Sequence, residues 1–459
     1  MTDSTRDDGS EPSHVVTAFV RNRGEILLVR RSDAVGSHVG RWDGVSGFAE
    51  GRPDERVRTE IREKTGLEDG VSLVRSGRPV EFEDPDLDRE RIVRPFLFDC
   101  DTREVKLSDE HDAFEWRSPT ATVDPSDGRE TVPKLWTAYE RVAPTARSVA
   151  ADDEHGAAFL SLRALEVVRD RAGVLVAERA EGEPDGSERN THESDGAETR
   201  SDAEWNELAE LAGRVLETRP SMAVLRNRVN RAMADADRTD DHPPGGAAVL
   251  ESAISGIERA AAADEDAAVN GGERIDGTVL TLSRSGTVLD ALREGSPSRV
   301  FVSESRPGRE GVGVAETLAS DSVLDCSVTV HTDAAAAHVL ATEAVDRVVV
   351  GADTVRPDGA VVNKTGTRAV SIAAARENVP VTVVAAADKL STRTTVNLES
   401  GDRAAVYDGN PSVDVANPTF DVTPAECVTE LVTETGSLEV DELEDIVEEL
   451  RELETWRDR

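Results

Sequence analysis

The chain has 459 residues, with 92 aspartate and glutamate residues against 53 lysine and arginine residues, and a formal net charge of −39. Because this length exceeds one ordinary hydrophobic core, we expect two or three domains. No dense basic cluster interrupts the acidic background, which excludes a protein that binds DNA through a basic stripe.

The acidic residues are spread along the whole chain, and lysine is rare beside arginine. Such a surface stays soluble in concentrated salt, where screening removes most of its self-repulsion. We therefore interpret the composition as that of a halophilic protein. The cysteines (Cys100, Cys326 and Cys427) have no CxxC spacing, and no apolar run reaches the ~18 residues of a membrane span. We expect a cytoplasmic protein with no membrane partner.

The first part of the chain predicts a disordered tail and then a compact domain. Residues 1–12 are polar and acidic. HVVTAFV and EILLVRR flank a short turn and predict a β-hairpin, and RIVRPFLFD and AFEWRSP predict further strands after a short helix. We expect residues 13–145 to form an α+β domain.

The helix of this domain carries paired carboxylates. Residues 47–67 read GFAEGRPDERVRTEIREKTGL, with Gly66 suited to the end of the helix. Glu60 and Glu63 are three residues apart and therefore share one helical face. Carboxylates so placed can hold Mg²⁺ against a pyrophosphate and orient a water molecule. The alternative is a solvated acidic face.

This segment resembles the Nudix box, G-x5-E-x7-R-E-U-x-E-E-x-G-U, in which U is a bulky aliphatic residue. The resemblance implies a Nudix fold, a nucleoside diphosphate derivative as substrate, and Glu60 and Glu63 as catalytic and metal-binding residues. The segment departs from the pattern in the helix, where Thr59 replaces the arginine and Lys64 replaces the last glutamate, and its loop is one residue short. A lysine beside the metal face repels a divalent ion. Weak hydrolysis and nucleotide binding without turnover both stay open.

A helical subdomain is expected over residues 146–270, because LRALEVVRDRAGVL and MAVLRNRVNRAM place apolar residues three and four apart. Residues 181–203 are charged and almost free of apolar residues, which predicts a mobile acidic loop.

The last part of the chain predicts a parallel sheet. TVLTLS, RVFVSES, SVTVHT, RVVVGAD and VTVVAAA alternate with helical segments, as in βαβ units. We expect a Rossmann-like domain over residues 271–437, then an acidic amphipathic helix over residues 438–459. The predicted fold class of the whole chain is therefore α/β.

Ligands bind at the carboxyl ends of the strands in such a sheet. The candidate ligand-binding residues at these ends are Ser283, Arg284, Ser285, Glu304, Arg306, Asp353 and Lys389.

Asn363 and Lys364 lie in an NKTGT turn just before the helical segment TRAVSIAAARE. A helix N-terminus favours an anion, and the ammonium adds a positive charge, so we expect a phosphate group there. Arg306 is a candidate for a second, bidentate contact. The alternative is a structural hydrogen bond between Lys364 and the Asp353 loop.

SESRPGREG, VVVGADTVRPDGAVVNKTGT and FDVTPAECVTELVTETG resemble the translation initiation factor 2B alpha/beta/delta family, which includes ribose-1,5-bisphosphate isomerase and methylthioribose-1-phosphate isomerase. The resemblance covers about residues 205–437. It implies a helical subdomain packed on a Rossmann-like domain, and a homodimer or higher homo-oligomer formed through the C-terminal domain.

The isomerases of this family use a cysteine and the aspartate of Gly-Ala-Asp. Asp353 matches the aspartate, Asn363 and Lys364 match the binding turn, and Ser283 stands at the cysteine position. A serine hydroxyl needs a neighbouring base to exchange protons, and no histidine adjoins Ser283. We therefore expect binding of a phosphorylated sugar or nucleotide. A regulatory subunit like those of initiation factor 2B is the alternative, and an isomerase is the less favoured one.

Overall fold

The computed structural model describes residues 12–68, 70–152, 155–182, 193–238, 244–439 and 442–458. The predicted tail lies outside the described residues except for residue 12. The chain divides into two compact units. Unit 1 comprises Met1–Thr145, Glu166–Leu208 and Asp241–Ile254; unit 2 comprises Ala146–Leu165, Ala209–Asp240 and Ser255–Arg459.

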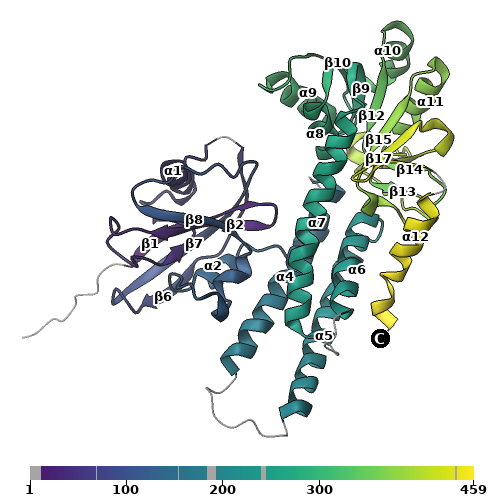
Figure 1. Cartoon of the computed structure of the whole chain (residues 1–459). Coiled ribbons are helices and arrows are strands. Elements are labelled where there is room, and N and C mark those ends of the chain that lie inside the picture. Colours follow the sequence, from purple (N-terminus) through teal and green to yellow (C-terminus); the bar gives the residue numbers. More distant parts are fainter. Residues whose placement is uncertain are drawn as a thin grey trace, which may run out of the picture. The chain divides into compact units, whose positions relative to one another are not determined.

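Unit 1 is built on a mixed eight-stranded sheet (Figure 1). Its strands are β1 (Ser13–Asn22), β2 (Glu25–Arg31), β3 (Trp42–Asp43), β4 (Val45–Phe48), β5 (Val71–Ser76), β6 (Val80–Asp84), β7 (Arg89–Cys100) and β8 (His111–Arg117). The main order is β3-β2-β1-β7-β5, with β4 on β1, β6 on β7 and β8 on β2. The central pair β1–β7 is parallel, and β1 and β2 form the predicted hairpin.

Two helices cover opposite faces of this sheet, α1 (Pro53–Thr65) and α2 (Leu135–Glu140). The alternation of side chains along β1 between the two faces of the sheet explains why both faces are covered. Val15 and Phe19 belong to a buried cluster that contains Tyr139 of α2. Val16, Ala18 and Val20 belong to a cluster that contains Ile61 of α1. Successive side chains of a strand point to opposite faces, so one strand supplies both cores.

A buried ionic network joins the sheet of unit 1 to the part of α4 (Ala157–Gly182) that begins at Glu166. Arg21 lies in β1 with 2 % of its surface exposed, and donates to Asp99 at 2.7 and 3.1 Å and to Glu166 at 3.0 Å. The Tyr139 hydroxyl donates to Asp170 at 3.0 Å. Each buried charge has a counter-charge, which offsets the cost of removing it from water.

The other long helices are α5 (Glu193–Thr218), α6 (Ala223–Asp237) and α7 (Gly246–Gly272), and a short α3 (Ala146–Ala151) precedes α4. Helix α5 corrects the predicted loop over residues 181–203, because residues 193–203 are helical. Glutamate and alanine are good helix formers, and low apolar content alone does not exclude a helix. Residues 183–192 lie outside the described part of the chain.

Unit 2 contains a seven-stranded sheet, with all five predicted strands present. The strands are β9 (Asp276–Leu282), β10 (Ser296–Ser303), β11 (Ser327–His331), β12 (Arg347–Val350), β15 (Val381–Val384), β17 (Glu430–Thr433) and β18 (Gly436–Leu438); the helices along the sheet are α8 (Gly286–Glu294), α9 (Glu310–Ser320), α10 (Ala336–Thr342) and α11 (Thr367–Glu377). The order is β11-β10-β9-β12-β15-β17-β18, and only β18 is antiparallel to its neighbour. The strand order reverses between β9 and β12.

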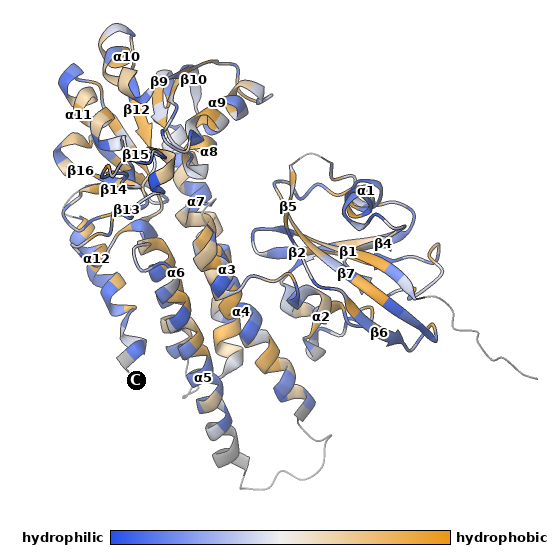
Figure 2. Cartoon of the chain, turned by 180° about the vertical axis from the view of Figure 1, so that it is seen from behind, coloured by the Kyte–Doolittle hydropathy of each residue, from blue (hydrophilic) through white to orange (hydrophobic). Residues whose placement is uncertain are grey.

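A small antiparallel sheet formed by β13 (Thr354–Val355), β14 (Val361–Lys364) and β16 (Phe420–Thr423) was not predicted. It places Asn363 and Lys364 at the end of a strand rather than in a turn. The C-terminal helix α12 (Glu442–Glu452) buries Leu443, Val447 and Leu450, and is packed. Hydrophobic residues concentrate in central strands of both sheets, as β7 and β12 show in Figure 2. None of the described helices combines the length and apolar composition that crossing a membrane requires.

Candidate functional site

The candidate site of unit 2 lies where the strand order reverses, at the carboxyl ends of β9 and β12. Ser283 directly follows β9, is buried, and has a φ of 63°. Its N–H donates to Ser305 Oγ at 2.7 Å, which joins the ends of β9 and β10. At Gly351, after β12, a Cβ would lie 2.7 Å from Ser285 Oγ, so only glycine allows this close approach. Where the strand order reverses, the loops after the two neighbouring strands run to opposite sides of the sheet and leave room for a ligand between them.

Asp353 and Lys389 form the charged centre of this site. Burial desolvates the Asp353 carboxyl and raises its pKa, and the positive charges of Lys389 and Lys364 oppose this rise. Burial likewise lowers the pKa of Lys389, against the attraction of Asp264 and Asp353. Lys389 is 5 % exposed, yet no described carboxylate lies within ion-pair distance of its ammonium. It is therefore a buried cation whose partner could be a ligand anion.

Helix α6 holds the loop that carries Lys389. Asn227 Nδ2 donates to the carbonyl oxygens of Asp388 at 2.8 Å and Leu390 at 2.7 Å, on both sides of the lysine. Arg228 pairs with Asp388 at 3.2 Å and with Asp264 at 3.0 Å. The sequence analysis did not identify these residues. The available signal was the run of polar residues on a helix in LRNRVNRAM, most of which are buried.

The NKTGT segment differs from its prediction. Lys364 Nζ donates to Glu310 at 2.9 Å, and among the described residues its ammonium forms no hydrogen bond with the Asp353 loop. The N–H groups of Gly366 and Arg368 donate to the Asp421 carboxylate at 2.7 and 3.1 Å. This corrects the expectation that the N-terminus of α11 is free for a ligand phosphate, because a side chain already fills it.

The remaining predicted residues lie around the strand ends in different roles. Ser285 caps α8 by accepting a hydrogen bond from Val288 N at 3.3 Å. Arg284 and Arg306 are exposed, and no carboxylate in the described ranges lies within ion-pair distance of either guanidinium. Glu304 is partly buried, with its N–H bonded to a carbonyl of β11. Asn363 Nδ2 donates to Thr367 Oγ1 at 2.9 Å.

The candidate site of unit 1 is a cavity of about 640 Å³ that includes both predicted carboxylates. Glu60 is 1 % exposed; its Oε1 lies 2.6 Å from Arg56, and its Oε2 lies 2.9 Å from Lys64. Glu63 is half exposed, with Arg56 4.0 Å away. A Cβ at Gly47 would lie 2.0 Å from the Glu60 carboxyl carbon, so the glycine makes room for this carboxylate. Glu60 and Glu63 thus share a cavity, with cations already beside them.

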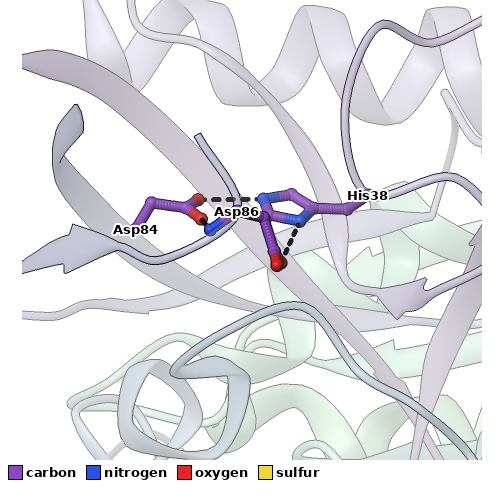
Figure 3. A group of neighbouring side chains, drawn as sticks. All are labelled: His38, Asp84 and Asp86. Atoms are coloured by element: carbon purple, nitrogen blue, oxygen red, sulfur yellow. Dashed lines mark hydrogen bonds and ion pairs between the residues drawn. The ribbon is translucent and has the colours of Figure 1, made fainter. Parts of the chain in front are cut away.

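A second cluster in unit 1 comprises His38, Asp84 and Asp86 (Figure 3). His38 Nε2 lies 2.9 Å from Asp84, and His38 Nδ1 lies 3.3 Å from Asp86. Arg91 lies 3.1 Å from Asp84, and Arg41 lies 2.6 Å from Asp86. Burial alone raises the pKa of Asp84, but hydrogen bonds from Arg91, from the Asp86 N–H and from His38 hold it below its usual value. Since a metal ion here would adjoin two guanidinium groups, we regard the cluster as a structural clamp.

Comparison with known proteins identifies the family of the chain. The sequence profile described as the initiation factor 2 subunit family matches residues 186–440. A ribose 1,5-bisphosphate isomerase of Haloterrigena turkmenica is 32 % identical over 339 residues, which cover 67 % of this chain and 93 % of that protein. A methylthioribose-1-phosphate isomerase of Nostoc punctiforme is 37 % identical over 169 residues, covering 34 % of this chain and 47 % of that protein.

Among solved structures, the translation initiation factor eIF-2B of Pyrococcus horikoshii superposes with a TM-score of 0.50 and 26 % identity, covering 65 % of this chain and 97 % of that one. The matched residues include the ends of β9 and β12, with Ser283 and Asp353. The chain therefore belongs to the initiation factor 2 subunit family.

Proposed function

We propose that unit 2 binds a phosphorylated sugar or nucleotide at the ends of β9 and β12 and does not isomerise it. The observation that carries this proposal is the buried Lys389, which lies with the desolvated Asp353 at the carboxyl end of the sheet, where Ser283 follows the neighbouring strand β9. Lys389, Lys364 and the exposed Arg284 and Arg306 supply positive charges around the strand ends, as recognition of phosphate requires.

Isomerisation between an aldose and a ketose moves a proton between adjacent carbons, so it needs groups that accept and donate protons near neutral pH. Asp353, with its raised pKa, is suited to hold one proton. Ser283 is not suited to the other role, because a hydroxyl needs a base. In the described part of the chain no side chain forms a hydrogen bond with Ser283 Oγ.

A non-catalytic regulatory subunit is the second candidate, since the family includes initiation factor subunits as well as isomerases. Membership of the family supports this reading, and we propose that such a subunit self-associates through unit 2. Ribose-1,5-bisphosphate isomerase activity is less favoured because Ser283 occupies the cysteine position.

The test incubates the purified chain with ribose 1,5-bisphosphate in molar KCl and assays ribulose 1,5-bisphosphate. We expect binding without product from the wild type and product from Ser283→Cys. Ser285→Cys, which places a thiol two residues away, is the matched control and should stay inactive. Robust product from the wild type that persists in Ser283→Ala would refute the proposal.

For unit 1, we propose binding of a nucleoside diphosphate derivative in the cavity that contains Glu60 and Glu63. These residues do not fit Mg²⁺ as they stand, because both Glu60 oxygens are paired with cations. We therefore derive no hydrolytic step and favour binding without turnover over weak hydrolysis. Fast Mg²⁺-dependent hydrolysis of a nucleoside diphosphate sugar, abolished by Glu63→Gln, would instead establish a Nudix-type pyrophosphohydrolase.

A further inference from the structure

The cavity of unit 1 is lined by more cations than carboxylates, in a chain whose overall balance is strongly acidic. Five cationic side chains line it, against three carboxylates: Arg31, Arg56, Lys64, Arg89 and Arg91, against Glu60, Glu63 and Glu110. Asp43 and Asp84 pair with Arg31 and Arg91, but neither aspartate is among the described residues that line the cavity. When these two aspartates are counted, five carboxylates balance the five cations, and Arg89 is the lining cation that has no described carboxylate at ion-pair distance.

Lys64 is coordinated as a bound cation would be. Its ammonium lies 2.9 Å from Glu60, 2.9 Å from Glu110, and within hydrogen-bonding distance of the Ser46 carbonyl. The ammonium therefore donates to the Ser46 carbonyl of β4 and forms ion pairs with Glu60 of α1 and with Glu110 just before β8. Hydrogen bonding to Lys64 is the largest cause of the lowered pKa of Glu110, so this carboxylate stays ionised. Lys64 occupies the oxygen cluster that a divalent ion would need.

The rim of the cavity carries an exposed aromatic ring and an arginine without an ion-pair partner among the described residues. Phe48 is 63 % exposed at the end of β4, and nothing in the described structure covers its ring. Arg89, at the start of β7, is exposed, and no described carboxylate lies within ion-pair distance of it. An exposed aromatic ring offers a stacking surface for a planar base, and a free guanidinium offers paired donors for a phosphate.

We propose that this cavity is a metal-independent receptor for a nucleotide, in which the Lys64 ammonium replaces the divalent cation. The phosphates contact the arginine side chains of the wall, and the base stacks on Phe48. Because three protein oxygens already surround its ammonium, Lys64 contributes charge rather than a direct hydrogen bond. The inference rests on the proposed binding of a nucleoside diphosphate derivative by unit 1.

The main test needs no substitution. Binding of ADP and of inorganic pyrophosphate to the full chain is measured by calorimetry in molar KCl, once with EDTA and once with Mg²⁺. We expect ADP affinities that agree within about twofold in the two conditions. ADP binding that requires Mg²⁺ would overturn metal independence and leave the proposed function of unit 1 intact. If neither ADP nor pyrophosphate binds in either condition, both proposals fail.

Variants then locate the site and test the role of Lys64. Phe48→Ala should weaken ADP binding about tenfold and leave pyrophosphate binding unchanged, because only ADP carries a base. Lys64→Glu should weaken ADP binding in EDTA about tenfold or more and restore it with Mg²⁺. Arg62→Glu, the same charge reversal at an exposed position of α1, is the control and should change neither. If Lys64→Glu does not fold, the wild-type comparison and Phe48→Ala still decide the proposal.

Discussion

His111 is a buried residue of unit 1 that shares its electrostatic environment with Lys64. Desolvation by burial, followed by repulsion from Lys64, lowers the pKa of its imidazole to about 4 from 6.5. The folded protein therefore holds His111 neutral at a pH where the unfolded chain binds a proton. The resulting stability is fully present above pH 6.5, the unfolded pKa, and is lost as the pH falls towards the folded pKa of about 4.

We predict that acidification from about pH 7 to about pH 5 lowers the free energy of unfolding of the wild type by about 2 kcal/mol more than that of His111→Gln. The glutamine variant does not titrate, so it isolates this one group from the carboxylates that also protonate. Denaturant unfolding at both pH values in molar KCl measures the difference. Parallel losses in the two proteins would show that His111 does not carry this effect.

A second prediction at the residue scale concerns Lys389, whose ammonium is desolvated with no carboxylate of the described residues at ion-pair distance. Lys389→Met keeps the length of the side chain and removes the buried charge, so we expect an increase of about 1 kcal/mol in the free energy of unfolding. We expect the same variant to lose affinity for ribose 1,5-bisphosphate. Unfolding and calorimetric titrations measure the two effects, and a variant that is less stable yet binds normally would make Lys389 a structural residue.

At the scale of elements, helix α11 depends on a cap from a distant strand. Asp421 of β16 accepts hydrogen bonds from the N–H groups of Gly366 and Arg368, and Gly366 has a φ of 113° that disfavours other residues. We predict that Asp421→Ala costs about 1–2 kcal/mol of stability, because it removes both a cap and a charge at the helix N-terminus. Asp421→Asn, which keeps an acceptor, should cost less. Equal losses would assign the whole effect to the charge, whereas an Asp421→Asn variant as stable as the wild type would argue against a charge effect.

This helix also shows where prediction from the sequence ends. The five strands of unit 2 were predictable because each is a β-branched apolar run, and the neighbourhood of Glu60 and Lys64 followed from a four-residue spacing on one helix. The capping of α11 was not predictable, because Asp421 is 55 residues from Gly366 along the chain. The same holds for Glu110 beside Lys64, and for Arg228 beside Asp264 and Asp388. Local periodicity specifies elements, whereas such pairings depend on how the elements pack.

For the whole molecule, the net charge of −39 governs the response to salt. Most ion pairs of the surface are partly exposed and weak, so they do not offset the repulsion among the remaining carboxylates. Raising KCl from about 0.01 M to about 1 M shortens the screening length from about 30 Å to about 3 Å. We predict a melting temperature that rises over this range. Sucrose at matched osmolality serves as the uncharged control, and an equal rise in sucrose would remove the electrostatic explanation.

The network around Arg21 has a consequence for how the two halves of the chain could ever be separated. A fragment ending at Thr145 would contain the whole sheet of unit 1 but lack Glu166 and Asp170. Arg21 would then lose one of its two carboxylate partners, and the Tyr139 hydroxyl would lose its acceptor. Cutting the gene at the apparent domain boundary would therefore leave Arg21 with Asp99 as its remaining carboxylate partner and the Tyr139 hydroxyl without its acceptor. A chimaera that exchanged only residues 1–145 would lose the same contacts. The boundary of unit 1 is therefore set by its contacts with Glu166 and Asp170 of α4 and not by the linker after Thr145.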